Sequence, residues 1–224
     1  MKKIILILIV VQISNFGFSQ TDSSKVLKKG FNVETTFRTC NISELNNTLK
    51  SSGISEIDNE LIGVSLGMYT RKQNKESYST TNFTWLQSSK NTGSQDSISS
   101  KLDIFELYFD MNWVIFNNSK WIFYPNSGLG VGLTRLQLKE NISFNQSITT
   151  FSDPAKYITT PNVFVNMGIG AERKIRIMKV NYSIGLILGY KLSTKSKWDY
   201  NNSPSISYGG FEYKIRIRID LPRN

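Results

Sequence analysis

The chain has no histidine and only one cysteine among its 224 residues. Histidine is the commonest general base and metal ligand near neutral pH, so its absence argues against Ser-His-Asp, Cys-His and zinc chemistry. One cysteine excludes an intrachain disulfide and a cysteine-based metal cluster. We therefore expect no enzymatic activity, no cofactor and no metal site. Catalysis by a serine paired with a carboxylate stays open as an alternative.

Long apolar runs are also scarce, and hydrophobic residues make up 39% of the chain. The main run, residues 4–11, is too short to cross a bilayer as a helix. It follows Lys2 and Lys3 and precedes Gly17 and Ser19, which suit positions −3 and −1 of a cleavage site. We expect residues 1–19 to be a cleaved signal peptide and residues 20–30 a polar leader. The residue directly after the cleavage site is Gln20 rather than cysteine, so a lipoprotein is not expected.

The charge is one-sided, with 27 Lys and Arg against 17 Asp and Glu, a net charge of +10. A nucleic-acid-binding protein usually gathers its basic residues into one patch or stripe. Here the basic residues alternate with apolar residues or fall in turns. We therefore do not expect a nucleic-acid partner.

What the chain does have is strict alternation, seen best at residues 210–221. Aromatic and aliphatic residues occupy every second position, and Glu212, Lys214, Arg216, Arg218 and Asp220 occupy the positions between them. Successive side chains of a strand point to opposite faces, so this stretch predicts a strand with one apolar and one ionisable face.

Similar alternation predicts eight strands, at residues 31–42, 61–70, 77–87, 102–116, 121–138, 158–173, 177–192 and 210–221. A short helix is predicted at 43–51, with Ser43 as N-cap and Gly53 as terminator. The shifted apolar phase at Leu136 and Leu138 predicts a bulge near residues 134–135. A basic turn is predicted at residues 173–176. The connections alternate between long and short along the chain, which is typical of outer-membrane barrels.

The predicted fold is all-β, an eight-stranded antiparallel up-and-down transmembrane β-barrel over residues 31–224, with one short helix in the first long loop. Its location would be the outer membrane. Aromatic residues flank two short turns and predict girdles at the bilayer boundary. They are Tyr69, Tyr78, Trp113, Phe116, Trp121 and Phe123.

Glycines opposite the apolar faces predict space in the interior for long side chains from other strands. An eight-stranded barrel is just wide enough for side chains to fill it. The last strand would lie opposite strand 102–116, so Asp110 and Glu106 would face Arg216 and Arg218. We expect a lumenal charge network that fills the barrel. Its predicted members are Glu34, Arg38, Glu106, Asp110, Lys214, Arg216 and Arg218.

Two alternatives stay open. The charged interior could form a narrow solute or ion conduit. Alternatively, the protein could be a secreted lipocalin-like binding barrel with its apolar faces inward, since ligand pockets are mostly apolar. Cys40 is expected to be an inert buried thiol. Gly128, Gly130 and Gly132 lie inside a strand, so a phosphate loop is not expected there.

Several segments resemble the small outer-membrane β-barrel proteins of Bacteroidota, the PorT-like group. They are the F-G-F-S-Q end of the signal (16–20), S-E-L-N-N-T-L-K-S-S-G (43–53), G-L-G-V-G-L (128–133) and the alternating last strand. The resemblance implies insertion by the outer-membrane assembly machinery, which reads the last strand. This last strand departs from the usual aromatic ending, because Leu221 is followed by Pro-Arg-Asn. The family offers no shared catalytic residues.

These observations together predict a non-enzymatic, integral outer-membrane protein. It would act as a structural or interaction component of the cell envelope. Its expected partners are outer-membrane lipid, the assembly machinery during insertion, and an envelope or surface partner that the sequence does not name.

Overall fold

A computed structural model describes residues 27–72, 77–88, 98–140, 155–178, 180–194, 196–197, 205–206 and 208–221. The expected signal peptide and most of the leader lie outside the described residues. One helix, α2 (Ser43–Ser51), and eight long strands carry the fold. The long strands are β1 (Leu27–Thr39), β2 (Glu60–Lys72), β3 (Tyr78–Ser88), β4 (Ile98–Asn112), β6 (Trp121–Glu140), β7 (Ala155–Ile177), β8 (Val180–Ser193) and β11 (Gly210–Asp220).

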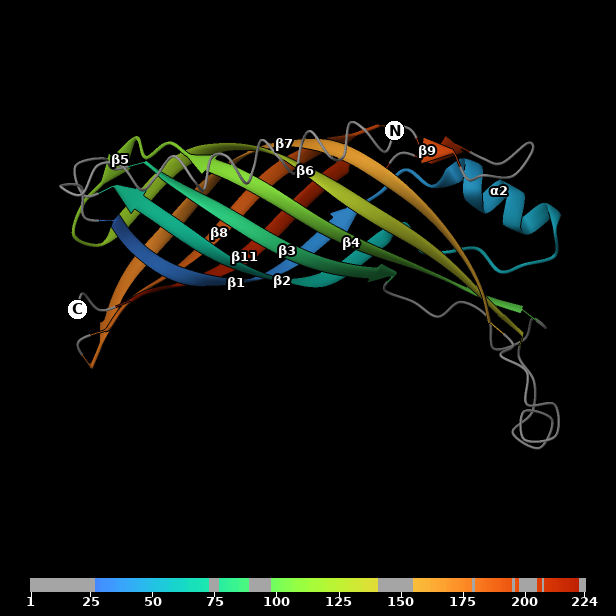
Figure 1. Cartoon of the computed structure of the whole chain (residues 1–224), viewed down its shortest axis with the longest axis horizontal. Coiled ribbons are helices and arrows are strands. Elements are labelled where there is room, and N and C mark those ends of the chain that lie inside the picture. The colour runs from blue at the N-terminus through green and yellow to red at the C-terminus, as the bar shows by residue number, and fades with distance from the viewer. Residues whose placement is uncertain are drawn as a thin grey trace.

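The eight long strands close into a barrel (Figure 1). Each one pairs antiparallel with its neighbour in the chain, β4 pairs with β6, and β1 pairs with β11 to complete the ring. This is the predicted eight-stranded up-and-down transmembrane barrel. Three shorter strands are also described. β5 (Phe116–Asn117) pairs with β6 in the same sheet, and β9 (Ser196–Lys197) and β10 (Ser205–Ile206) pair with each other. No helix among the described residues is long and apolar enough to cross a bilayer.

The barrel has two different ends. Short connections join β2 to β3, β4 to β6, and β7 to β8, and the first and last strands also have their outer ends there. We call this the short-turn end. Long connections join the strands at the other end, the long-loop end, where α2 lies between β1 and β2 (Figure 1).

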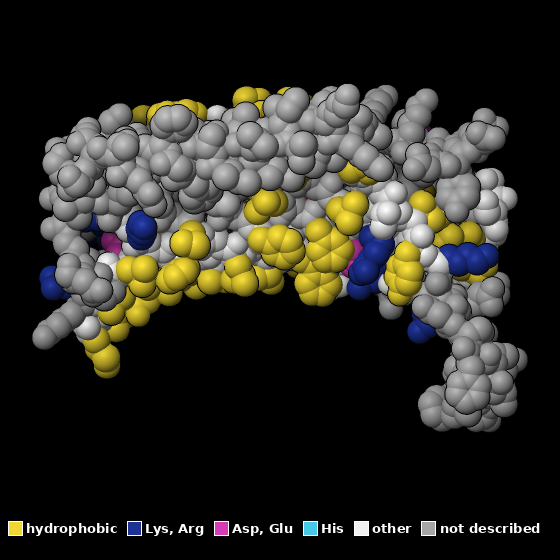
Figure 2. Space-filling model, in the orientation of Figure 1, with side chains coloured by type: hydrophobic (Ala, Val, Ile, Leu, Met, Phe, Trp, Pro, Cys, Tyr) yellow, Lys and Arg dark blue, Asp and Glu magenta, His cyan; other side chains and the backbone are white. Residues whose placement is uncertain are grey.

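The outer wall is apolar, as a lipid-facing surface requires. Many outward positions of the strands carry exposed aliphatic or aromatic side chains, as in Val64, Leu66 and Met68 on β2. Figure 2 shows hydrophobic side chains gathered along the part of the visible face that is not drawn in grey. A lipocalin-like barrel needs the opposite arrangement, with apolar faces inward, so this alternative is wrong.

Several predicted details of the strands are wrong. The register of β6 with β4 and with β7 is unbroken through Thr134 and Arg135, so no bulge forms there. The phase shift has another cause: Leu136 points into an interior that is itself apolar at this level. Residues 173–176 belong to β7, and the turn falls instead at Met178, which has a positive φ of 46°. The N-cap of α2 is Ile42 rather than Ser43.

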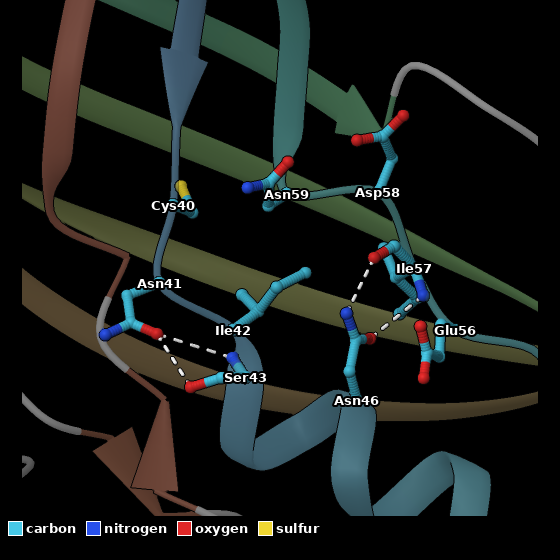
Figure 3. Close-up of a pocket in the computed structure, with 9 residues that line it drawn as sticks. All are labelled: Cys40, Asn41, Ile42, Ser43, Asn46, Glu56, Ile57, Asp58 and Asn59. Carbon is cyan, nitrogen blue, oxygen red and sulfur yellow. Dashed lines mark hydrogen bonds between the residues drawn. The ribbon is translucent and has the colours of Figure 1, made fainter.

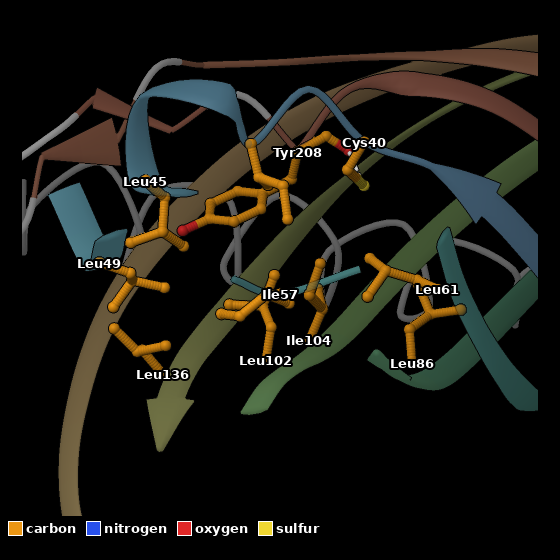
Figure 4. Close-up of a cluster of buried hydrophobic side chains, with 11 residues drawn as sticks. Cys40, Leu45, Leu49, Ile57, Leu61, Leu86, Leu102, Ile104, Leu136 and Tyr208 are labelled. Carbon is orange, nitrogen blue, oxygen red and sulfur yellow. Dashed lines mark hydrogen bonds between the residues drawn. The ribbon is translucent and has the colours of Figure 1, made fainter. Parts of the chain in front are cut away.

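The interior changes character along the barrel axis. Toward the long-loop end, inward residues of several strands pack with α2 into a buried apolar cluster, which we call the apolar cap (Figure 4). Leu45 and Leu49 of α2 both face it, four residues apart on one side of the helix. The cap comprises Cys40, Ile42, Leu45, Leu49, Ile57, Leu61, Leu86, Leu102, Ile104, Leu136 and Tyr208.

The aromatic residues at the short-turn end divide into two groups. Trp113, Phe116 and Trp121 are exposed on the outside, as expected of a girdle. Tyr69 and Tyr78 are buried and point into the barrel, so the girdle prediction is wrong for them. Their hydroxyl groups explain the difference, because Tyr78 donates a hydrogen bond to buried Glu172 and Tyr69 donates one to Asp220, a partly exposed carboxylate at the end of β11.

Candidate functional site

The interior below the apolar cap holds a dense set of buried charges. Strand alternation sends them inward: on β11, Glu212, Lys214, Arg216 and Arg218 are buried, whereas Phe211, Tyr213, Ile215 and Ile217 between them are exposed. Arg38 is 2% exposed and Arg216 is fully buried. Ion pairs link nine of these charged side chains to one another, and we call the nine the lumenal charge network. They are Glu34, Arg38, Glu106, Glu172, Lys191, Glu212, Lys214, Arg216 and Arg218.

Arg38 is the centre of the part that lies against the apolar cap. Its two terminal nitrogens donate to the two oxygens of Glu106 at 2.6 and 2.7 Å, a bidentate pair. Its Nε donates to Glu212 at 3.1 Å. Lys191 donates to Glu106 at 2.7 Å, and Lys214 lies 2.9 Å from Glu212. Two glutamates therefore share three cations from three different strands.

Glu172 is the centre of the part nearer the short-turn end. Its Oε2 lies 3.1 Å from Arg218 and accepts a hydrogen bond from Ser183 at 2.6 Å. Arg216 pairs with Glu34 at 2.7 Å and reaches to 3.7 Å from Glu172. The 4.0 Å contact between Lys214 and Glu34 joins the two parts, so the network is continuous along the axis.

Tyrosines complete the coordination of these charges. Tyr78 and Tyr124 donate to Glu172 at 2.9 and 2.7 Å, and Tyr108 donates to Glu34 at 3.2 Å. The ring faces also contact cations, with Arg218 4.5 Å from the Tyr78 centroid and Lys214 4.7 Å from that of Tyr108. Buried ions need such additional hydrogen bonds to offset the loss of water.

The structure brings together six of the seven residues predicted from the sequence. Asp110 is also buried in the interior, but no ion pair joins it to Arg216 or Arg218 among the described residues. Those arginines pair with Glu34 and Glu172, and Asp110 Oδ1 instead accepts a hydrogen bond from Asn166 at 2.7 Å. Glu106 likewise pairs with Arg38 and Lys191, not with the arginines of β11.

Three members of the network, Glu172, Lys191 and Glu212, were not predicted. The signal was available, because each lies on the inward-facing register of its own strand. Glu172 and Lys191 stand among glycines and small polar residues. Such positions predict only interior space for long side chains from other strands. Glu212 belongs to the ionisable face of the last strand.

This arrangement leaves little room for chemistry on a bound molecule. A methyl group added at Gly128 would lie 2.0 Å from Asp110 Oδ1 and 2.7 Å from Asn166 Oδ1, so the glycine is required by the side chains opposite. No cluster of His, Cys, Asp and Glu that could hold a metal occurs among the described residues. The network can hold strands together, but it presents no accessible nucleophile.

A depression of about 420 Å³ opens at the long-loop end, between the end of β1, α2 and residues 56–59 (Figure 3). The side-chain amide of Asn46 donates a hydrogen bond to the Ile57 carbonyl oxygen at 2.8 Å and accepts one from the Ile57 N–H at 2.9 Å, which links α2 to the returning chain. Cys40 lines the depression but is 5% exposed. Burial raises the pKa of its thiol to about 11, as expected for an inert thiol.

The geometry defines a small transmembrane β-barrel with a filled interior, and comparison with solved structures agrees on the fold. Ail, the attachment invasion locus protein of Yersinia pestis, in complex with the heparin analogue sucrose octasulfate, aligns at a TM-score of 0.52 and 9% identity, over 87% of this chain and 99% of Ail.

Two other similar structures are weaker matches. Neisserial surface protein A aligns at 0.43 and 10% identity, over 87% and 97% of the two chains. A major outer membrane protein of Thermus thermophilus aligns at 0.46 and 10% identity, over 86% and 98%. No family model and no curated protein sequence matches the chain.

Proposed function

We propose that the protein is a non-enzymatic, integral outer-membrane β-barrel that serves the cell envelope as a structural or interaction component. The observation that supports this role is the filled interior. Charged side chains with their partners occupy the middle of the barrel, and the apolar cap covers them at the long-loop end. Binding surfaces for partners are then left at the two ends.

Sequence and fold together support the location. A signal peptide at residues 1–19 would deliver the chain to the periplasm, and the assembly machinery would insert it by reading β11. The short-turn end would face the periplasm and the long-loop end the outside, as in other outer-membrane barrels. The PorT-like resemblance favours an origin in Bacteroidota.

A test of the location expresses the full chain, with its signal peptide, in a Gram-negative host. We expect it in the outer-membrane fraction, with gel migration that changes on heating because folded barrels resist detergent. A soluble product with no heat-dependent shift would contradict the proposal. Crosslinking from the long loops of the folded protein would then identify the partner.

The narrow conduit remains the second candidate, favoured by the continuous line of charges along the axis. The network argues against it, because an ion would have to displace pairs as short as 2.6 Å. In planar bilayers we expect conductance at noise level. Reproducible single-channel steps that disappear in Arg38→Met would instead establish the conduit.

A further inference from the structure

A groove is present on the lipid-facing outer wall. It has a volume of about 440 Å³ and lies near the short-turn end, over β6, β7, β8 and β11. Its lining is apolar except for one arginine. The residues that matter here are Trp121, Ala171, Arg173, Ile175, Leu186 and Ile215.

The groove exists because one small residue stands in a row of large ones. Ala171 of β7 pairs with Phe123 on one side and with Leu186 on the other, and Leu186 pairs in turn with Ile215. All four side chains share the outward register, so the alanine methyl group forms a floor between taller neighbours. An elongated apolar chain fits such a depression.

Arg173 stands between Ala171 and Ile175 of β7 in the lining of this groove and is the residue that needs a partner. It is exposed on the outward face of β7, paired across the strands with Trp121 and Ile184. No ion pair with Arg173 forms among the described residues. A charge at the edge of an apolar, lipid-facing wall is costly unless it reaches an anion in the head-group layer.

We infer that this groove binds one phospholipid of the leaflet at the short-turn end. An acyl chain lies over Ala171, between Trp121 and the Leu186–Ile215 side. The lipid phosphate accepts hydrogen bonds from the guanidinium of Arg173, a pairing that planar arginine makes well. Exposed tryptophan beside the arginine suits the same boundary between acyl chains and head groups.

The position of the groove favours a lipid over a protein partner. Its walls are continuous with the exposed apolar belt, where Ile184 and Leu186 are about half exposed, and this belt faces acyl chains. The inference therefore rests on the transmembrane fold and does not depend on the envelope partner proposed above.

Native mass spectrometry of the folded, delipidated full chain tests the inference. The protein in detergent micelles is titrated with dioleoylphosphatidylglycerol, and each variant is first checked for heat-modifiable migration. We expect wild type to retain one phospholipid. Ala171→Leu should abolish retention by filling the floor, and Arg173→Gln should weaken it about tenfold through loss of a charge-assisted contact.

Matched controls and probes keep the outcome decisive. Val165→Leu adds bulk to the outward face of β7 away from the groove, and Lys29→Gln removes an exposed cation at the same end; both should bind as wild type does. Wild type should bind dioleoylglycerol, which lacks the phosphate, as weakly as Arg173→Gln binds the phospholipid. Equal retention by all variants, or competition by inorganic phosphate alone, would overturn the inference. A co-purified protein found bound in the groove would also overturn the inference.

Discussion

The interior of the barrel is filled in two ways: by charged side chains in the lumenal charge network and by hydrophobic side chains in the apolar cap. Below α2, inward positions carry Arg38, Glu106 and their partners, which interact through ion pairs of 2.6 to 3.0 Å. Only a short way along the same strands, Leu102 and Ile104 of β4 precede Glu106 on the inward register and belong to the apolar cap.

The difference shows that inward does not mean polar in this barrel. Where α2 covers the barrel, water is excluded and packing is apolar. In the middle, the walls bring long charged side chains close enough to pair. We therefore expect the two regions to respond differently to substitution: by loss of a charge partner in one, and by creation of a cavity in the other.

The largest effect should come from removing one partner in the charged half. Glu106→Ala leaves Arg38 and Lys191 without their shortest contacts, and an uncompensated buried charge costs about 3–5 kcal/mol. Urea unfolding in lipid vesicles, followed by gel migration, measures the loss. As a control, Glu56→Ala removes the exposed pair with Lys50 at 3.4 Å and should cost less than about 1 kcal/mol. Equal losses for the two variants would mean that the network is not stabilising.

The apolar cap should show the next largest effect. Leu102→Ala leaves a cavity at a fully buried site between α2 and the barrel wall, at a cost of about 2–4 kcal/mol. The same unfolding assay applies. Leu133→Ala is the matched control, because Leu133 is 45% exposed on the outer wall and should lose clearly less. If Leu133→Ala proved the more costly variant, the cap would not be a packed core.

Substitution of Asp110 should distinguish the effect of losing an ion pair from the effect of burying a carboxylate in the charged half. Asp110→Asn keeps the shape and can still accept the hydrogen bond from Asn166, so we expect a change of about 1 kcal/mol or less. Glu106→Gln, which loses a bidentate arginine partner, should cost about 3 kcal/mol. A larger loss for Asp110→Asn would show that its carboxylate compensates the cations at longer range.

The smallest effect concerns Cys40, at the boundary of the cap. Burial raises its pKa from 9.0 to about 11, so its thiolate fraction at pH 8 is about a hundredfold below that of the unfolded chain. Iodoacetamide labelling should be slower by at least about tenfold in the folded barrel. Leu45→Asn in α2 should restore part of the rate, whereas Thr48→Asn on the exposed side of α2 should not.

The raised pKa of Cys40 also determines how the stability of the folded protein changes with pH. The folded pKa lies above the unfolded one, so this contribution to stability is complete below pH 9. It is lost as the pH rises from about 9 to 11. Cys40→Ala should remove this part of the alkaline loss and leave stability at neutral pH almost unchanged.

The sequence predicts the strands and their faces well because alternation is a local property. Partner choice is not local. Whether Arg216 meets Asp110 or Glu34 depends on how far neighbouring strands are shifted along the barrel, and strand order alone does not give this shift. The bulge predicted from Leu136 is wrong for a related reason. Its inward position looks like a bulge unless one knows that the interior is apolar at that level.

The pairing of β1 with β11 has a consequence for how the protein is made. Glu34 and Arg38 come from the first strand, and their partners Arg216 and Glu212 come from the last. A chain that stops before residue 212 leaves both first-strand charges without these partners, and it has no strand with which to close. Synthesis must therefore be complete before the interior is neutralised. A fragment without β11 can neither close the barrel nor supply these charge partners.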